Sequence, residues 1–286
     1  MPGPRDTPLA VLTSRVRIEE KRIFEALERR NIPYHHLDER DLSLALVDEP
    51  VSWTAVINRC MSNTRSRYAA QLFEAYGVRV LNSSQVIATC GDKLLTSLAL
   101  VKAGVPTPYT MVALSPAAAL AALDRIGYPA VLKPVSGSWG RLLAKVNDRD
   151  AAEAILEHKQ ILGSPQHSVI YIQEYIDKPG RDIRVIVIGE RVLCAMYRQA
   201  EHWITNTARG ATTRPCEITD ELAELVLRAA AAVGGGALAI DVLEHADGRL
   251  LVNEINHTME FHGMMSATDV DVADALVQYA LEVTGL

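Results

Sequence analysis

Residues 243–258 read LEHADGRLLVNEINHT and continue an apolar run that begins at 237. A second apolar run covers 250–255, and the pair Asp247-Gly248 lies between the two runs. Because both central residues of a type I′ turn have positive φ, an Asp-Gly pair in this place indicates a two-residue hairpin turn. The stretch therefore predicts two antiparallel strands that are joined at 247–248.

A two-residue turn also fixes the register of the hairpin. The facing pairs are then Ala246 with Arg249, Glu244 with Leu251, and Asp241 with Glu254. Asn256 lies two residues beyond Glu254, so it projects from the same face. Opposed carboxylates on a sheet are unfavourable unless something offsets their charge. Because all three side chains are hard oxygen donors, we predict a Mg²⁺ site at Asp241, Glu254 and Asn256; the alternative is the polar solvent face of an ordinary hairpin.

The composition indicates a chain with a substantial core. It has 286 residues, of which 49% are hydrophobic and 22% charged, enough for two or three modest domains. We find no apolar run long enough to span a membrane, and no signal peptide. The cysteines form no CxxC pair, which disfavours zinc and redox motifs and favours a cytoplasmic location. A net charge of −6 argues against a nucleic-acid partner, and no membrane partner is expected.

Residues 1–92 alternate between apolar strands and amphipathic helices. Strands are predicted over 9–13, 33–37, 55–57 and 78–81, and helices over 19–30 and 66–76. This alternation is typical of a small α/β domain with a parallel sheet. Asn58 and Arg59 follow the third strand, at the edge where such sheets bind ligands. A polar pair in a loop is the alternative, and it is the interpretation that we prefer from these residues alone.

The pair Gly91-Asp92 marks a boundary, and we expect three domains, over 1–92, 93–167 and 168–286. Asp92 is suited to cap a helix over 93–102. The second domain is predicted to contain helices over 117–126 and 151–162 and strands over 130–134 and 142–146.

Lys133 lies on one of these buried strands, where its charge needs compensation. The loop 135–141, VSGSWGR, follows it and offers close backbone approach with free N–H groups, which suits phosphate. The loop is not a P-loop, because GxxxxGK[ST] is absent and a strand follows. A flexible hairpin tip is the alternative for the loop, but a nucleotide phosphate would supply the charge that Lys133 needs.

The third domain begins with a strand over 169–173 and a hairpin over 185–197 with a two-residue turn at Gly189-Glu190. Residues 202–210, HWITNTARG, are predicted as a loop. Its Asn206 and Arg209 suit a phosphate oxygen or a carboxylate, whereas a mobile surface loop is the alternative. Thr219 caps a helix whose apolar stripe is core: Leu222, Leu225, Val226, Ala229, Ala230 and Val233. A last helix is predicted over 272–283.

Taken together, these motifs resemble an ATP-grasp ligase of the RimK-like branch. The similarity rests on Lys93, Lys133 with its Ser/Gly loop, 173–176, Asp182 and the hairpin 241–256, in that order. The segments GDKLLTSLALVKAGVPTP, VLKPVSGSWGRLLAKV, QEYIDKPGRDIRV, HWITNTARG and LLVNEINHTMEF resemble the LysX type of ligase. The resemblance implies an α/β ATP-grasp fold of three subdomains, with the nucleotide between the central and C-terminal subdomains.

The resemblance also implies a role for each site residue. Those assigned to ATP are Lys93, Lys133, Ser136, Gly137, Ser138, Trp139, Gly140, Gln173, Glu174, Tyr175, Ile176 and Asp182. Asp241, Glu254 and Asn256 would hold Mg²⁺, and Arg209 with Asn206 would offset charge on the transferring phosphoryl group. Arg184, Arg198, Asn206, Asn256 and Thr258 are the candidates for binding the amino-acid substrate. No general base is evident.

Enzymes of the LysX type join the amino group of α-aminoadipate to the γ-carboxylate of the C-terminal glutamate of a small acidic carrier protein, LysW. The resemblance implies this activity and, by analogy, a homotetramer. An acidic carrier needs a local basic surface, for which Arg59, Arg65, Arg67 and Arg141 are a hypothesis, with ordinary solvated charges as the alternative.

Three other functions remain open from the sequence. They are a bifunctional enzyme that accepts α-aminoadipate and glutamate, a RimK-type enzyme that adds glutamate to a protein C-terminus, and a regulatory nucleotide-binding protein without catalysis. The last is disfavoured, because all the metal-site positions and Arg209 are kept. The two amino acids differ by one methylene, so the sequence does not separate them.

Overall fold

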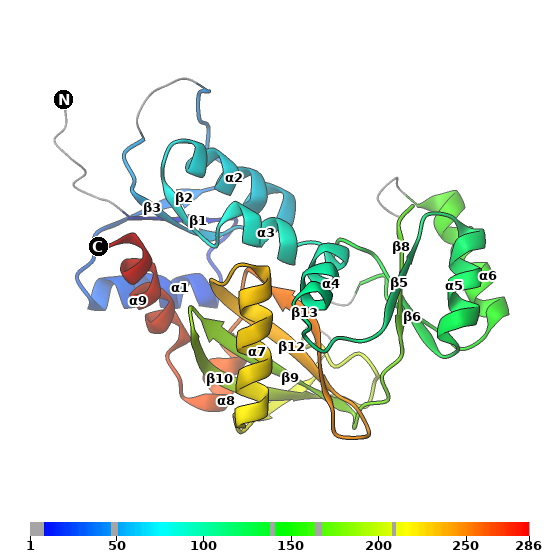
Figure 1. Ribbon diagram of the computed structural model, residues 1–286. Helices are drawn as coiled ribbons and strands as arrows, with labels where there is room; N and C mark the ends of the chain where they lie inside the picture. The colour runs from blue at the N-terminus through cyan, green and yellow to red at the C-terminus, as the bar shows by residue number, and fades with distance from the viewer. Residues whose placement is uncertain (1–8, 47–50, 138–140, 164–167, 208–209, 286) are drawn as a thin grey trace.

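The structure is a computed structural model, and it describes residues 9–46, 51–137, 141–163, 168–207 and 210–285. Within these ranges the chain forms three β-sheets with helices packed on them (Figure 1). The strands are β1 (Leu9–Thr13), β2 (Tyr34–Asp38), β3 (Ala55–Arg59), β4 (Arg79–Leu81), β5 (Thr110–Ala113), β6 (Ala130–Lys133), β7 (Ala144–Val146), β8 (Ile170–Glu174), β9 (Arg181–Ile188), β10 (Arg191–Gln199), β11 (Thr212–Pro215), β12 (Ala237–Glu244) and β13 (Leu250–Asn256). The helices are α1 (Ile18–Arg29), α2 (Asn63–Ala75), α3 (Ser84–Cys90), α4 (Lys93–Lys102), α5 (Pro116–Ile126), α6 (Arg149–Leu162), α7 (Asp220–Val233), α8 (His262–Thr268) and α9 (Val272–Thr284).

The N-terminal sheet has the order β2-β1-β3-β4 and is parallel, as the alternation of strands and helices predicts. Successive strand residues point to opposite faces. Leu9 and Val11 therefore pack on the side of α1 and α9, whereas Ala10 and Leu12 pack with Phe73 of α2 on the other side.

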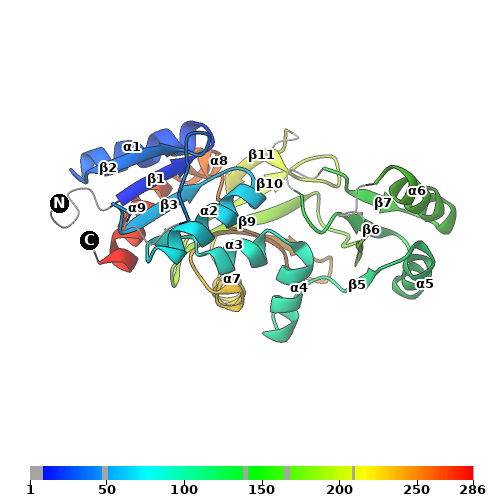
Figure 2. The ribbon, with the colours of Figure 1, turned by 90° about the horizontal axis from the view of Figure 1, so that it is seen from above.

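The other two sheets are antiparallel. The central sheet has the order β5-β8-β6-β7 and carries α5 and α6 on one face. The C-terminal sheet has the order β11-β10-β9-β12-β13, and α7 packs on it. Seen from above, the N-terminal sheet and the central sheet lie at opposite ends of the molecule, with the C-terminal sheet between them (Figure 2).

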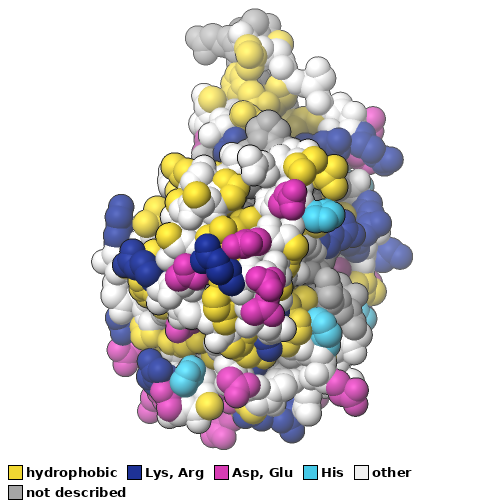
Figure 3. Space-filling model, turned by 90° about the vertical axis from the view of Figure 1, so that its right-hand side faces the viewer, with side chains coloured by type: hydrophobic (Ala, Val, Ile, Leu, Met, Phe, Trp, Pro, Cys, Tyr) yellow, Lys and Arg dark blue, Asp and Glu magenta, His cyan; other side chains and the backbone are white. Residues whose placement is uncertain are grey.

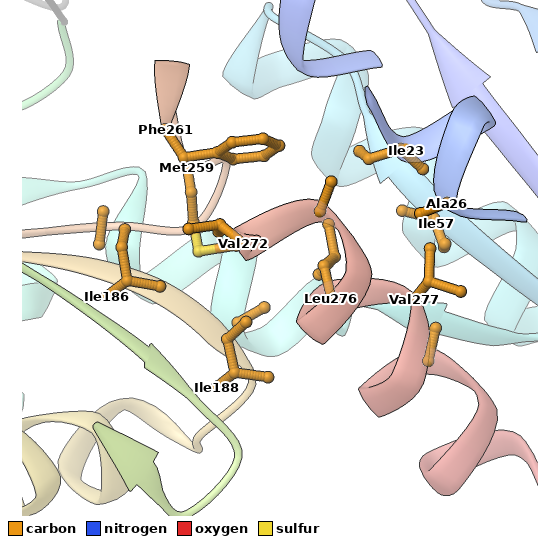
Figure 4. Packing of buried hydrophobic residues seen from close by; sticks show 14 of the residues in the cluster. Ile23, Ala26, Ile57, Ile186, Ile188, Met259, Phe261, Val272, Leu276 and Val277 are labelled. Atoms are coloured by element: carbon orange, nitrogen blue, oxygen red, sulfur yellow. The ribbon is translucent and has the colours of Figure 1, made fainter. Parts of the chain in front are cut away.

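One hydrophobic cluster joins the two ends of the chain. Ile23 of α1 and Ile57 of β3 belong to the same cluster as Ile186 of β9 and Leu276 of α9, as Figure 4 shows. The segment after β13 contributes Phe261, which is fully buried. Because burial of apolar surface is the main favourable term in folding, this shared core fixes the N-terminal unit on the C-terminal sheet.

Most of the long elements agree with the sequence analysis. Asp92 and Thr219 cap their helices by accepting bonds from the first-turn N–H groups, as predicted. All six apolar residues of the predicted α7 stripe are buried. Four short elements, α3, α8, β5 and β11, were not predicted, because each is too short to show a hydrophobic period.

The turn of the β12–β13 hairpin is not the predicted one. His245 N donates to Arg249 O, so the loop contains Ala246, Asp247 and Gly248. Only Gly248 among these three has a positive φ, of 90°, which is typical of a three-residue loop rather than a type I′ turn. Glu244 consequently faces Leu250 and not Leu251.

Asp241 nevertheless faces Glu254, as predicted. The register shifts by one residue between Asp241 and Val242, and Asn253 is the extra residue of a β-bulge in β13. The bulge compensates for the additional loop residue. Among the described residues, no helix is both long and apolar enough to cross a membrane.

Candidate active site

Two cavities adjoin one another where the three sheets approach. The first, here the intersheet cavity, lies between the central and C-terminal sheets; its lining includes Lys133, Gln173, Asp182, Arg198, Asp241 and Asn253. The second, here the junction cavity, lies between the N-terminal unit and the end of β13; its lining includes Arg17, Asn63, Gly91, Arg184, Asn256 and Thr258. Lys93, Gly137, Asn206 and Glu254 line both cavities, and they mark the place where the two meet.

Lys133 of β6 is 8% exposed and reaches across the intersheet cavity. Its Nζ donates to Gln173 Oε1 at 2.5 Å and to Asn253 Oδ1 at 2.9 Å. Burial lowers the pKa of Lys133 to about 8, because the charged ammonium loses hydration. Two neutral amide oxygens do not cancel that charge, so it remains available to an anion in the cavity.

A chain of buried ion pairs forms the floor of the intersheet cavity. Arg198 bonds both carboxylate oxygens of Asp182, at 2.7 and 2.9 Å, and its Nη2 lies 3.0 Å from Asp241. Arg184 in turn bonds both oxygens of Asp241, at 2.8 and 2.9 Å. Burial would raise the pKa of Asp241, but Arg184 and Arg198 outweigh it and hold the pKa below its usual value. These charges are therefore fixed before any ligand binds.

Apolar side chains form another wall of the same cavity. They are Val131, Leu143, Ile176, Trp203 and Leu243. Tyr175 lies edge-on to Trp203, and the Nζ of Lys145 lies 3.7 Å from the centroid of the Tyr175 ring. An apolar wall beside a polar floor suits a flat heterocycle that carries an anionic chain.

Residues 173–176, which the resemblance assigns to ATP, begin with two side chains that are held by other groups of the protein. Gln173 is 2% exposed, and its side chain binds Lys133. Glu174 Oε1 accepts from the Tyr109 N–H at 2.6 Å. Tyr175 and Ile176 line the cavity as well. Residues 173–176 thus all line the intersheet cavity.

The predicted magnesium ligands are brought together in part. Asp241 and Glu254 are cross-strand partners, as expected, and Asn256 follows on the same strand. Asp241 lines the intersheet cavity, Asn256 the junction cavity and Glu254 both. Among the described residues, no group of three His, Cys, Asp or Glu side chains is arranged to hold a metal ion, so a cation here depends on the Asn256 amide.

The donor set still fits a hard cation. Glu254 is the accessible carboxylate, and Lys93 Nζ lies 3.2 Å from its Oε1. A cation would take the Oδ1 of Asn256, whereas its buried Nδ2, which has no acceptor among the described residues, would donate to an anionic ligand. Asp241 could coordinate the same cation only through oxygens that already bind Arg184 and Arg198.

The junction cavity is bounded by the residues that follow β13. His257 and Thr258 lie in its wall, and Thr258 Oγ1 is 2.9 Å from His257 Nδ1. Burial and, to a smaller extent, the nearby Arg59 lower the pKa of His257 to about 4, so this ring is neutral at pH 7. Arg17 lines the opposite wall and binds Glu20 and Glu260.

Side chains of the N-terminal unit hold this wall in place. Arg59 is 3% exposed; it donates to Glu20 at 3.0 Å and to the carbonyl of Met259 at 2.9 Å. Its guanidinium also lies over the Phe261 ring. Asn82 donates to the carbonyl of His257 at 2.7 Å. Arg59 thus belongs to the interior, so the hypothesis that it forms part of an exposed basic surface is wrong.

Asn58 is buried too, and it bonds the carbonyl of Ser66 and the N–H of Cys60. Asn58 and Arg59 are the last two residues of β3 and are both buried, so the preferred interpretation of a polar pair in a loop is wrong; their contacts are structural. Unlike Arg59, Arg65 has an exposed side chain, although it pairs with Glu39. Arg67 lies over the Tyr68 ring, and Arg141 lines the intersheet cavity.

The predicted phosphate loop is seen in part. Ser136 lines the junction cavity and Gly137 lines both, and the Gly137 carbonyl accepts from Lys93 Nζ at 2.9 Å. Gly137 has a φ of 152°, which few residues other than glycine adopt. The other predicted residues of the loop and one predicted catalytic residue lie outside the described residues: Ser138, Trp139, Gly140 and Arg209.

Several residues of the site were missed by the sequence analysis. Asn253 was overlooked because a regular strand would point it away from the face of Glu254. Lys178 donates to Thr205, which in turn donates to Asp182, and both Lys178 and Thr205 line the intersheet cavity. Arg17 stands far from the other motifs in sequence. Lys178 alone had a usable signal, as a lysine four residues from Asp182.

Comparison with known proteins identifies the family. A family model described as the RimK-like ATP-grasp domain matches residues 90–280, and one described as the LysX preATP-grasp domain matches residues 9–89. The chain belongs to the RimK-like ATP-grasp ligases. The family and the α/β ATP-grasp fold predicted from the sequence are thereby confirmed, and the protein is an ATP-dependent ligase.

Individual relatives agree with this family. The glutamate–LysW ligase ArgX of Sulfurisphaera tokodaii is 39% identical over 269 residues, which is 93% of this chain and 95% of that relative. The α-aminoadipate–LysW ligase LysX of the same organism is 32% identical over 279 residues, covering 94% and 96%. The crystal structure of a RimK domain ATP-grasp protein from Sphaerobacter thermophilus superposes with a TM-score of 0.78 at 26% identity, covering 96% of this chain and 99% of that one.

Proposed function

We propose that this ligase joins the α-amino group of α-aminoadipate to the γ-carboxylate of the C-terminal glutamate of a LysW-type carrier protein, with ATP and Mg²⁺, in lysine biosynthesis. The observation that carries the proposal is the pair of cavities that meet at Lys93, Gly137, Asn206 and Glu254. A ligase needs a nucleotide and an acceptor on either side of one phosphoryl group, and this arrangement supplies both places.

The nucleotide is assigned to the intersheet cavity. The apolar wall with Ile176 and Leu243 suits adenine, and Lys133 suits a phosphate. Asp182, which the resemblance assigns to ATP, would bind the ribose hydroxyls, and it can do so only with lone pairs that Arg198 and Thr205 leave open. Ser138, Trp139 and Gly140 stay part of the proposal as the loop that closes over the phosphates.

Mg²⁺ is assigned to Glu254 and Asn256, with Asp241 as a third ligand. When bound, it would neutralise charge on the two terminal phosphates. Glu254 lines both cavities, so the same carboxylate faces the nucleotide and the acceptor.

The carrier's carboxylate is assigned to the junction cavity. There one carboxylate oxygen would attack the terminal phosphorus of ATP, so that ADP leaves and an acyl phosphate forms. The amine would then attack the acyl carbon, inorganic phosphate would leave, and the nitrogen would lose a proton to solvent. Lys93 at the meeting point, together with Arg209 and Asn206, would offset the charge of the phosphoryl group in both steps.

The substrate's own carboxylates need cationic partners in the same cavity. Arg184 lines it, but its guanidinium is already bidentate to Asp241. Arg198 lines only the intersheet cavity, so of the two predicted arginines Arg184 is the better candidate. Arg17 and Thr258 add donors on the other walls of the junction cavity.

Glutamate is a second candidate for the amino acid. It is favoured by the 39% identity to the glutamate–LysW ligase ArgX, compared with 32% to LysX of the same organism. Both relatives are named as LysW ligases, which supports the carrier more than either amino acid. A RimK-type protein glutamate ligase remains the third alternative.

The test is the mass of purified carrier protein after incubation with enzyme, ATP and Mg²⁺, with α-aminoadipate and glutamate in separate reactions. We expect the carrier to gain one α-aminoadipate residue and little glutamate. Gain of glutamate alone would make the protein the glutamate ligase, and gain of both would make it bifunctional. No gain from either, while ATP still binds, would overturn the carrier-ligase function.

A further inference from the structure

We propose that Asn253 is a positioning residue for the nucleotide: it acts through Lys133, and the β-bulge in β13 serves to present it. The proposal rests on the proposed function of the intersheet cavity as the nucleotide site. It concerns a residue that the sequence motifs passed over, because Asn253 stands next to Glu254 on a strand where neighbours normally face opposite ways.

The bulge changes which side chains reach the cavity. Val252 and Ile255 are fully buried in the core under α7, although on a regular strand residues three apart face opposite sides. Counted from Val252, a regular strand would send Glu254 toward that core, and counted from Ile255 it would send Asn253 there. With the extra residue at 253, Asn253 and Glu254 both line the intersheet cavity. Two consecutive polar residues, Asn253 and Glu254, thus line the same cavity.

The contact to Lys133 gives Asn253 its role. An ammonium has three N–H donors, and the side chain of Lys133 directs two of them to Gln173 Oε1 and Asn253 Oδ1. Among the described residues, no carboxylate forms an ion pair with Lys133. Two fixed acceptors orient the ammonium, and the third N–H is left for a ligand in the cavity.

The chemistry of the acceptors is as important as their position. A carboxylate at either position would bind the ammonium more strongly but would cancel its charge, which a phosphate needs. Amide oxygens satisfy a buried lysine without doing so. Burial already lowers the pKa of Lys133 to about 8, so loss of an acceptor would further disfavour the charged form.

The test is the affinity for ADP, measured by calorimetry in the presence of EDTA, for wild type, Asn253→Leu, Lys133→Met and the double variant. We expect Asn253→Leu to weaken ADP binding about tenfold, the scale of one hydrogen bond to a charged group. In the double variant ADP should bind no more weakly than to Lys133→Met alone, because Asn253 acts through that lysine. Adenosine, which has no phosphate, should bind wild type and Asn253→Leu equally.

A matched control comes from the opposite edge of the same strand. Thr107 Oγ1 donates to the Val252 carbonyl at 2.8 Å and lines neither cavity, so Thr107→Val disturbs β13 without touching Lys133. It should leave ADP affinity unchanged. If Asn253→Leu does not fold, as judged by its thermal transition, Asn253→Ala replaces it with the same expectation.

The possible outcomes distinguish failure of the role of Asn253 from failure of the intersheet cavity as the nucleotide site. Additive losses in the double variant, or equal losses for ADP and adenosine, would show that Asn253 acts through the fold and not through Lys133. If Lys133→Met itself leaves ADP affinity unchanged, the nucleotide does not bind in the intersheet cavity, and the proposed function of that cavity fails instead.

Discussion

The intersheet cavity and the junction cavity share residues but are built differently. The first is formed by strands of two sheets, and its buried groups bind one another, as Asp182 does Arg198 and as Lys133 does Gln173. The second is formed by the end of β13 on one side and the N-terminal unit on the other. Its wall is held from outside, by Arg59 and Asn82. The intersheet cavity is thus preorganised by the strands of two sheets, whereas the junction cavity is preorganised by contact between the N-terminal unit and the C-terminal sheet.

The charges on the surface bear on how an acidic carrier could be attracted. Figure 3 shows acidic and basic side chains mixed over the face at the central-sheet end, with Lys and Arg gathered along one edge. With a net charge of −6, attraction of an acidic carrier has to be local. Under the proposed function, we therefore expect specificity for the carrier to come from the walls of the junction cavity and not from the overall charge.

The largest expected effect is on the wall of the junction cavity. Arg59→Met would leave the buried Glu20 without one of its partners, and we expect the free energy of unfolding to fall by about 3–5 kcal/mol in urea titrations. The double variant with Glu20→Gln should recover part of this loss. A loss below about 1 kcal/mol for Arg59→Met would contradict the idea that the wall is held from the N-terminal unit.

The next effect belongs to the intersheet cavity. Lys133→Met should lower kcat/KM for ATP about a hundredfold, because one preorganised charge at the phosphates is lost. The KM for the carrier should change little. The exposed Lys102 at the end of α4 is the matched control, and Lys102→Met should behave as wild type. Equal effects of Lys133→Met on ATP and carrier would mean that the two cavities are not separate sites.

A smaller effect is expected from Arg17, whose side chain is 15% exposed in the junction cavity. Arg17→Met should raise the KM for the carrier or the amino acid about fivefold to tenfold, the scale of one charge-assisted hydrogen bond. The KM for ATP should stay as in wild type. Initial rates with each substrate varied in turn will show whether the change follows the acceptor side, as the comparison requires.

The smallest effect is a pH dependence of the intersheet cavity. Burial lowers the pKa of Lys133 to about 8, from an ordinary value of 10.5. ADP affinity should therefore decline as the pH rises through 8, since the ammonium is lost. The unfolded chain binds the proton more readily, so this group makes the ligand-free protein more stable as the pH rises from about 8 to 10.5. Both trends should be absent in Lys133→Met, and their persistence there would assign them to another group.

The two predicted hairpins show how far the sequence reaches. Gly189-Glu190 forms the expected two-residue turn, with Ile188 facing Arg191 and a φ of 60° at Gly189. The pair Asp247-Gly248 indicates a two-residue turn just as strongly from the sequence, but in the structure it lies in a three-residue loop. The facing of Asp241 and Glu254 was predicted correctly only because the bulge at Asn253 cancels the turn error. Bulges depend on packing between strands, which residue identity alone does not encode.

Prediction of the candidate active site from the sequence has a similar limit. Lys133, Gln173 and Glu254 could be placed from motifs, because each belongs to a local segment with a family pattern. That Arg184 would pair with Asp241 could not be foreseen, since the two residues lie 57 positions apart and meet only in the sheet. The same holds for Arg59 and Met259, 200 positions apart. Long-range pairing decides which charged groups are free for a substrate.

The most direct test of the two-cavity account is a crystal structure with ADP, Mg²⁺ and a peptide of the carrier's C-terminus. The account predicts phosphate oxygens within hydrogen-bond distance of Lys133 Nζ, and the terminal glutamate in the junction cavity beside Arg17 and Thr258. Its γ-carboxylate should approach the nucleotide at Lys93 and Glu254. A nucleotide in the junction cavity, or a peptide that reaches the phosphates without entering that cavity, would contradict it.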